Sequence, residues 1–461
     1  MKRLLALLLA ITLVLGLAAC GGNGDTDPTP TPDLTPTPAP IEEDPVLRIG
    51  ALFTLSGYDS PIGRDQQDAA TLFFETREDQ MGPYTVEFFV EDDGGVIDTA
   101  LAGARSLVET EEVHLLFGAH RHNVGFAIAE YAIGEGIPYL IPSVTAEDLT
   151  QRRRNDLLVR TGESSAQATH PFGQWAFARG YNRIATVAVD EAASWETVAG
   201  FRRTFEEAGG EVIIQLWTPA GTSEFRPFLG QLPADIDAIF INYATGTEAM
   251  RMIEAIAETL PGITIFAGAR TVDETVLPRL NDAALGIYSA SPWIATSDHM
   301  WASHFTDRFV ERFGRIPSSY AMETYTALTM LDAAIGLAGG FSGRYDRVLE
   351  MLRNDTITPK GIITLDGWNN PTQDIHIRQV ARVDGILANI HVHTFPQVTQ
   401  FWTYDPFFFL ALPVYDRNFN TADHNAMLEE LGPGDFARPL PGDINDNEEE
   451  NESENEGETA S

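Results

Sequence analysis

Residues 47–63, LRIGALFTLSGYDSPIG, contain the two features that decide the fold. The first is the run 47–53, whose mostly apolar content is typical of a strand buried on both faces of a parallel sheet. The second is the loop 54–63, which is rich in small residues and polar donors and leads into an amphipathic helical pattern. A buried strand followed by a loop and such a helix is the repeating unit of α/β folds.

The same alternation continues along the chain in two series. We expect further strands of the first series at 85–90, 113–117 and 137–141. The second series starts at Arg183 and gives strands at 184–189, 212–217, 238–242, 264–267 and 287–290. Because helical patterns alternate with these strands, the two series predict an α/β fold with two doubly wound parallel sheets.

Three loops at predicted strand ends are candidates for a binding site. They span 54–63, 118–123 and 142–150. Parallel sheets with helices on both faces bind ligands at the carboxyl ends of their strands, where these loops lie. Free backbone N–H groups at the following helix starts can donate to a carboxylate or another acceptor. We therefore expect a small molecule to bind there.

Composition and missing motifs narrow the function classes. With 461 residues, 44% of them hydrophobic, the chain can bury a large core and form more than one domain. Its formal net charge of -37 repels nucleic-acid phosphates, so we expect no nucleic-acid partner. The sequence contains no nucleophile elbow, zinc-protease helix or phosphate-cradling loop, and we therefore expect no enzymatic activity and no cofactor. His120 and His122 have no Cys or carboxylate at ligand spacing, so we expect no metal site there.

The amino terminus has the pattern of an export signal. Lys2 and Arg3 precede an apolar run, Leu4 to Leu17, that is too short to span a bilayer comfortably. The run continues into Ala18, Ala19 and Cys20, which resembles the lipobox of bacterial lipoproteins. This resemblance implies a signal peptide at 1–19 and a lipidated Cys20 that anchors the protein to the outer face of the cell membrane.

Three further segments lie outside the α/β pattern. Thr-Pro repeats predict an extended tether over 20–45. The acidic stretch 441–461 has too little apolar surface to fold and predicts a solvated tail. The extension 396–440 is rich in aromatic residues and would be an aggregation hazard if exposed. Either it packs back on the folded part near the hinge, which we favour, or it is a docking patch for a membrane partner.

Several short motifs occur together in the folded region. They are Ile49-Gly50-Ala51-Leu52-Phe53, Phe117-Gly118-Ala119, Gly136-Ile137-Pro138 and Ser143-Val144-Thr145. In their order and spacing the chain resembles the leucine/isoleucine/valine-type family of periplasmic solute-binding proteins over about residues 46–389. The resemblance implies the type I periplasmic binding fold, in which two lobes close on a solute in the cleft between them.

The resemblance also implies where the chain crosses between lobes. The three crossings are expected near Arg160-Thr161, Pro292-Trp293 and 361–365. The lobe boundaries that follow are 46–161 plus 293–362 for lobe one, and 162–292 plus 363–395 for lobe two.

Residues of the family's site can be carried over to this sequence. Ser143, Val144 and Thr145 match the turn that holds the α-amino and carboxylate groups of an amino acid. Trp195 matches an aromatic residue that covers the ligand, although it could instead pack on a neighbouring helix. Tyr58, in the first loop, either caps the cleft or covers a loop, and Tyr243 completes the aromatic candidates.

Two residues depart from the family pattern. His122 stands where a serine usually meets the ligand's carboxylate, and Arg270 stands where an acidic residue usually pairs with its ammonium. An arginine would repel an ammonium and offer a planar fork to a carboxylate. This predicts a solute with at least one carboxylate or comparable acceptor and no obligatory ammonium. Alternatively, Arg270 turns away and pairs with Asp273 or Glu274.

Two function classes remain open at this stage. In the first, the loaded protein, expected to be a monomer, delivers its solute to the permease and ATPase subunits of an ABC importer. In the second, the same module senses the solute and reports it to a membrane receptor without transport. Delivery is the main expectation, and sensing is the alternative.

Overall fold

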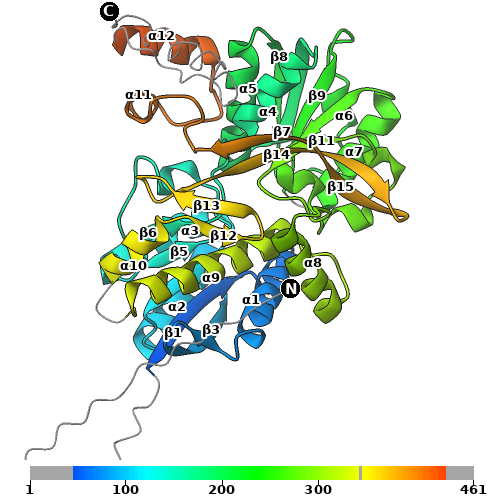
Figure 1. Ribbon diagram of the computed structural model, residues 1–461. Coiled ribbons are helices and arrows are strands. Elements are labelled where there is room, and N and C mark those ends of the chain that lie inside the picture. The colour runs from blue at the N-terminus through cyan, green and yellow to red at the C-terminus, as the bar shows by residue number, and fades with distance from the viewer. Residues whose placement is uncertain (1–44, 245, 342–344, 432–461) are drawn as a thin grey trace, which may run out of the picture. The chain divides into compact units, whose positions relative to one another are not determined.

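The computed structural model describes residues 45–244, 246–341 and 345–431 (Figure 1). The predicted signal peptide, Cys20, all but one residue of the predicted tether and the acidic tail therefore lie outside the described residues. Among the described residues, no helix combines the length and apolar character needed to span a membrane.

The first sheet has the strand order β2-β3-β1-β4-β5-β6. Its strands run in parallel except β2, which pairs with β3 in the antiparallel direction. The bounds are β1 Val46–Phe53, β2 Gln80–Met81, β3 Tyr84–Asp92, β4 Leu115–Gly118, β5 Tyr139–Ile141 and β6 Leu158–Arg160. Each strand predicted for the first series is present, with ends that differ by at most two residues.

Helices cover both faces of this sheet. Successive residues of a strand point to opposite faces, so Phe53 belongs to the buried cluster on one face and Leu52 to the cluster on the other. The first face is covered by α1 Ser60–Glu75, α9 Ser319–Ala338 and α10 Tyr345–Leu352, and the second by α2 Ile97–Arg105 and α3 His122–Glu135. A further helix, α8 Met300–Phe313, packs on α1.

The second sheet has the order β12-β13-β14-β11-β10-β9-β7-β8, and β15 pairs with β14. Its parallel part consists of β7 Arg183–Val189, β8 Glu211–Thr218, β9 Ala238–Asn242, β10 Thr264–Ala267 and β11 Tyr288–Ser291. One face is covered by α4 Thr169–Ala178 and α5 Ala192–Glu207, and the other by α6 Arg226–Leu229 and α7 Gly246–Thr259. The two predicted α/β sheets are thus confirmed.

This second sheet is mixed rather than wholly parallel. The added strands β12 Thr356–Thr358, β13 Gly361–Leu365, β14 Pro371–Val383 and β15 Ile386–Val398 all pair in the antiparallel direction. Asp384 and Gly385 join β14 to β15 with φ angles of 50° and 86°. Two residues with positive φ form a tight hairpin, and such a hairpin connects only antiparallel strands.

The chain passes between the two sheets three times. It leaves the first sheet after Arg160, at the end of β6, and builds the second sheet up to Ser291. It then returns through α8, α9 and α10 to the first sheet, and crosses again by way of β12 and β13 (Figure 1). Each sheet with its helices forms one lobe.

The described part of the aromatic extension packs on the second lobe. It contains α11 Pro406–Ala411 and α12 Thr421–Leu431, which lie beside α4 and α5 (Figure 1). Phe409 and Tyr415 belong to the same buried cluster as Phe172 of α4 and Phe201 of α5. Of the two interpretations from sequence, packing on the folded part is therefore the one that the structure shows.

Candidate functional site

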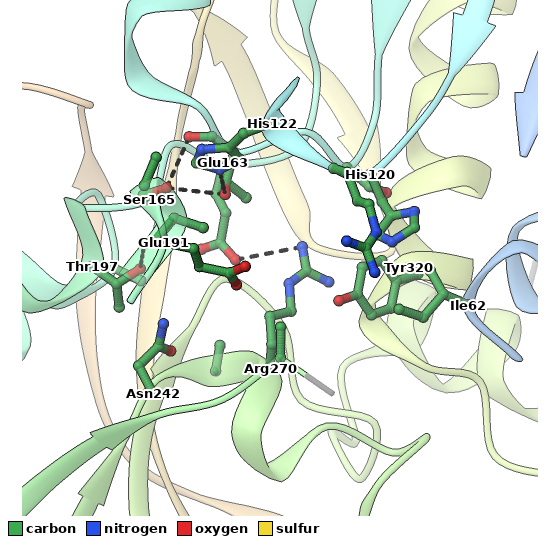
Figure 2. A pocket seen from close by; sticks show the side chains of 18 of the residues that line it. Ile62, His120, His122, Glu163, Ser165, Glu191, Thr197, Asn242, Arg270 and Tyr320 are labelled. Atoms are coloured by element: carbon green, nitrogen blue, oxygen red, sulfur yellow. Dashed lines mark hydrogen bonds and ion pairs between the residues drawn. The ribbon is translucent and has the colours of Figure 1, made fainter. Parts of the chain in front are cut away.

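A cavity of about 370 Å³ lies between the two lobes. Its lining comes from the segments that follow the carboxyl ends of β1, β4, β5, β6, β7, β9 and β10, together with Ala290 of β11 and Tyr320 of α9. Figure 2 shows side chains from both lobes pointing toward one space. This is the position at which parallel α/β sheets hold ligands, and the volume lies within the usual range for small-molecule sites.

Four of the predicted site residues line the cavity. They are His122, Ser143 and Thr145 from the first lobe and Arg270 from the second. The family resemblance singled them out, and each follows a strand end, where the geometry of parallel sheets places ligand contacts.

The other predicted residues lie outside this lining. Val144 and Tyr243 are buried in the cores of the first and second lobes. The half-buried Trp195 donates from its indole N–H to Asp190, at 3.0 Å. Tyr58 is 56% exposed, and its hydroxyl accepts from the backbone N–H of Thr247, in the opposite lobe, at 2.9 Å. Tyr58 lies at the cavity's edge, in a hollow that shares Asp59, Ile62 and Ala244 with the main lining.

His122 and Thr145 form a neutral polar wall. The Nε2 of His122 lies 2.9 Å from Thr145 Oγ1, and the Ser165 hydroxyl donates to the same threonine. Burial, followed by the charge of Arg160, lowers the pKa of His122 to about 3. The imidazole is therefore neutral near pH 7 and adds no positive charge to the site.

Arg270 joins the two lobes within the cavity. It lies in a short 3-10 turn after β10, Ala269–Val272, and donates to Ser319 Oγ at 2.6 Å and to Glu323 Oε1 at 2.7 Å, both in α9. Its guanidinium carbon lies 4.0 Å from the centre of the Tyr320 ring. Burial lowers the pKa of Arg270, but Glu323 and its acidic neighbours raise it above the ordinary value, so the charge is retained.

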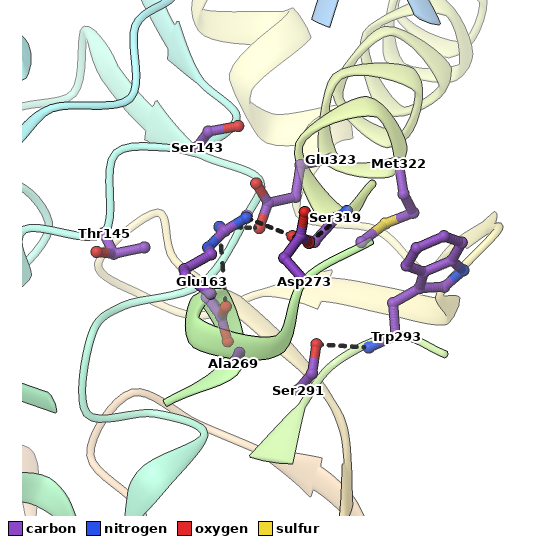
Figure 3. A network of polar contacts seen from close by, with 12 residues as sticks. Ser143, Thr145, Glu163, Ala269, Asp273, Ser291, Trp293, Ser319, Met322 and Glu323 are labelled. Atoms are coloured by element: carbon purple, nitrogen blue, oxygen red, sulfur yellow. Dashed lines mark hydrogen bonds and ion pairs between the residues drawn. The ribbon is translucent and has the colours of Figure 1, made fainter. Parts of the chain in front are cut away.

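The alternative partners expected for Arg270, Asp273 and Glu274, bind other groups. Asp273 accepts instead from the backbone N–H of Ser319, at 3.0 Å, and from the Ser319 hydroxyl (Figure 3). Glu274 accepts from the side chain of Asn389. Arg270 thus lines the cavity with Glu323 as its close partner.

Several acidic lining residues were missed from sequence. Glu163 follows β6, Glu191 follows β7, and Asp59 precedes α1. A polar residue just after a predicted strand is a signal that would have selected Glu191, which follows the predicted strand 184–189, whereas no strand was predicted before Glu163. Tyr320 reaches the cavity from α9, which comes after another helix and not directly after a strand. Its position in the sequence therefore gave no such signal.

Asp59 is held within the first lobe by two basic side chains. Arg121 Nε donates to Asp59 Oδ2 at 2.8 Å, and His120 Nε2 lies 3.2 Å from the same oxygen. Burial alone would raise the pKa of Asp59, but these partners outweigh it and hold the pKa below the usual value. Within residues 45–431, apart from the undescribed gaps, no group of three or more His, Cys, Asp or Glu side chains is arranged to hold a metal ion.

Comparison with known proteins identifies the family. Residues 46–382 match the family model described as periplasmic binding protein. The chain belongs to this family. A Leu/Ile/Val-binding protein homolog from Brucella melitensis is 22% identical over 76% of this chain and 92% of its own length.

Solved structures of ABC transporter binding proteins agree with the fold. An ABC transporter substrate-binding protein from Sphaerobacter thermophilus is 29% identical, with a TM-score of 0.74, and covers 77% of this chain and 99% of its own. A solute-binding protein from Rhodopseudomonas palustris, in complex with 3,4-dihydroxy benzoic acid, is 25% identical, with a TM-score of 0.72 over 78% of this chain and 99% of its own. The predicted family and fold are thus confirmed.

Proposed function

We propose that this protein is an extracytoplasmic, lipid-anchored binding protein that captures a small solute by lobe closure and delivers it to an ABC importer. The solute is polar or carries a carboxylate, as amino-acid-like compounds, amides and organic acids do. The relatives from Sphaerobacter thermophilus and Rhodopseudomonas palustris, both named as binding proteins of ABC transporters, support delivery.

The observation that carries this proposal is the cavity between the lobes. Both lobes contribute polar side chains to it, and contacts such as Tyr58 to Thr247 and Arg270 to Glu323 cross from one lobe to the other around it. A site built from two lobes couples binding to their relative orientation. We infer that His122, Ser143, Thr145 and Arg270 contact the solute.

A thermal-shift screen over amino acids, amides and aromatic or aliphatic carboxylates tests solute binding. A compound at 100-fold its dissociation constant should raise the free energy of unfolding by about 2.7 kcal/mol. Deleting the gene should then abolish uptake of that compound by cells. Uptake that continues unchanged would contradict delivery, even if the compound binds.

The anchor is tested separately at Cys20. Cys20→Ser removes the only cysteine of the chain and with it the site of lipidation. The variant should fold with unchanged melting temperature and appear in the soluble fraction, because acyl chains supply the membrane affinity. If it still sediments with membranes after a high-salt wash, the prediction of a lipid anchor at Cys20 is wrong.

A further inference from the structure

Glu163 presents a buried acceptor to the cavity. Its side chain is 7% exposed, and its Oε2 has no hydrogen-bond partner among the described residues. Its other oxygen, Oε1, lies 3.9 Å from Arg270 Nη2, beyond hydrogen-bond distance. Figure 2 shows the carboxylate beside Arg270, facing the space between the lobes. A buried acceptor without a donor is unfavourable unless the occupant of the cavity supplies one.

The cationic side chains around Glu163 donate hydrogen bonds to other groups. Arg270 donates to Ser319 and Glu323. Lys360 donates to the carbonyls of Thr161 and Gly162 and to Gln373. Arg378 donates to Ser289 and to the carbonyls of Trp293 and Ala269. These groups balance charge near Glu163 but leave its Oε2 without a donor.

The charges on the lining favour a cationic donor over a neutral one. Arg270 is already paired with Glu323, which is 1% exposed. Glu163 and Glu191 remain as two lining carboxylates that no cation contacts at hydrogen-bond distance among the described residues. A charged N–H group forms the strongest hydrogen bond with a carboxylate.

We propose that Glu163 determines specificity by accepting a hydrogen bond from an ammonium group of the solute, an inference that rests on the proposed solute-binding function. The protein then prefers solutes with an ammonium group to plain organic acids of the same carbon skeleton. Arg270 does not prevent this, because its charge is neutralised by Glu323 rather than offered to the solute.

The test uses probes that share a skeleton but differ in charge. One set is leucine, isoamylamine and 4-methylpentanoate, and the other is phenylalanine, phenethylamine and 3-phenylpropanoate. Calorimetry at pH 8 should show tighter binding of the ammonium-bearing members. Glu163→Gln should weaken their binding by about 10- to 100-fold, as expected for a lost charge-assisted hydrogen bond, and leave the plain acids unchanged or tighter. Glu211→Gln, at an exposed carboxylate of β8, is the matched control and should change nothing.

A second measurement needs no variant. Burial raises the pKa of Glu163 to about 7, with Glu323 acting in the same direction and Arg270, Lys360 and Arg378 opposing it. The ionised carboxylate binds an ammonium group, so affinity for the amines should rise between pH 6 and pH 8. Affinity that falls over this range overturns the proposal even if Glu163→Gln fails to fold.

The outcomes separate this proposal from the function on which it rests. If the plain acids bind tightest, Glu163 does not select an ammonium group, while solute binding stands. If neither these probes nor any compound of the thermal-shift screen stabilises the wild-type protein at millimolar concentration, both proposals fail.

Discussion

Arg270 lies among carboxylates that come from distant parts of the chain. Its partner Glu323 is 53 residues away in sequence and belongs to the other lobe. A buried carboxylate that loses its cation is strongly destabilising, whereas replacing both charges by apolar groups is often neutral. The pair therefore matters for stability as well as for binding.

Arg270→Met should lower the free energy of unfolding by about 3–5 kcal/mol, because Glu323 is left buried without its cation. Arg270→Met combined with Glu323→Met should recover most of that loss, and urea denaturation measures both. A double variant as unstable as the single one would show that the ion pair is not the cause. Arg270→Glu should be destabilising for the same reason, instead of simply changing the preferred ligand charge.

His122 makes stability depend on pH. Its pKa is about 3 in the folded protein, against an ordinary value of 6.5, so between these values the unfolded chain binds more protons. The free energy of unfolding therefore falls as the pH falls. Between pH 7 and pH 5, wild type should lose about 2 kcal/mol more than His122→Gln. His393→Gln, at an exposed imidazole of β15, should lose as much unfolding free energy as wild type between pH 7 and pH 5. If His122→Gln also loses as much as wild type, His122 is not the cause of the pH dependence.

At the scale of elements, the aromatic extension is part of the second lobe's core. Tyr415 packs edge-on against His170 and accepts from Arg203 Nη1 at 3.0 Å, and the guanidinium carbon of Arg203 lies 3.7 Å from the centre of the Tyr404 ring. The extension also reaches the first lobe, where Arg152 donates to the carbonyl of Leu412 at 2.7 Å. Residues 399–431 thus contact both lobes on the side of the chain crossings.

Deleting residues 399–461 should expose the aromatic faces of α4 and α5 and leave Arg203, now 1% exposed, without Tyr404 and Tyr415. We expect aggregation, or a melting temperature at least about 10 °C lower, because several buried aromatic side chains are lost. Deleting only 441–461, the predicted acidic tail, is the matched control. If the long deletion has the same melting temperature as the control, the extension does not contribute to the stability of the core.

At the scale of the whole folded region, the two lobes are in direct contact around the cavity. Tyr58 contacts Thr247, Arg270 contacts Glu323, and the backbone N–H of Glu147 donates to Glu196 at 3.3 Å, each across the lobe boundary. Opening the cleft breaks these contacts, and a solute held from both sides favours the closed arrangement.

Binding should therefore reduce the radius of gyration measured by solution scattering. The measurement uses a compound that the thermal-shift screen has verified, at saturating concentration, with a non-binding analogue as the control. An unchanged radius of gyration with a tight ligand would contradict closure by the lobes.

The sequence by itself determined the two α/β series and most strand positions. Runs such as 238–242 and 264–267 are apolar throughout or nearly so, and parallel strands buried on both faces require this pattern. The family resemblance singled out His122, Ser143, Thr145 and Arg270, and all four line the cavity because each follows a strand end. The hairpin of β14 and β15 was missed, although Asp384-Gly385 is a turn signal that precedes an apolar residue.

Only the tertiary structure decided the charges of the site. A sequence pattern gives the direction of a strand and the loop that follows it, but not which distant side chain meets that loop. Arg270 alone suggested an anionic solute, whereas its pairing with Glu323 and the unpartnered Oε2 of Glu163 favour an ammonium group. His122 becomes neutral because burial penalises its charged form. Burial and pairing depend on contacts between lobes, and these contacts exist only after the chain has folded.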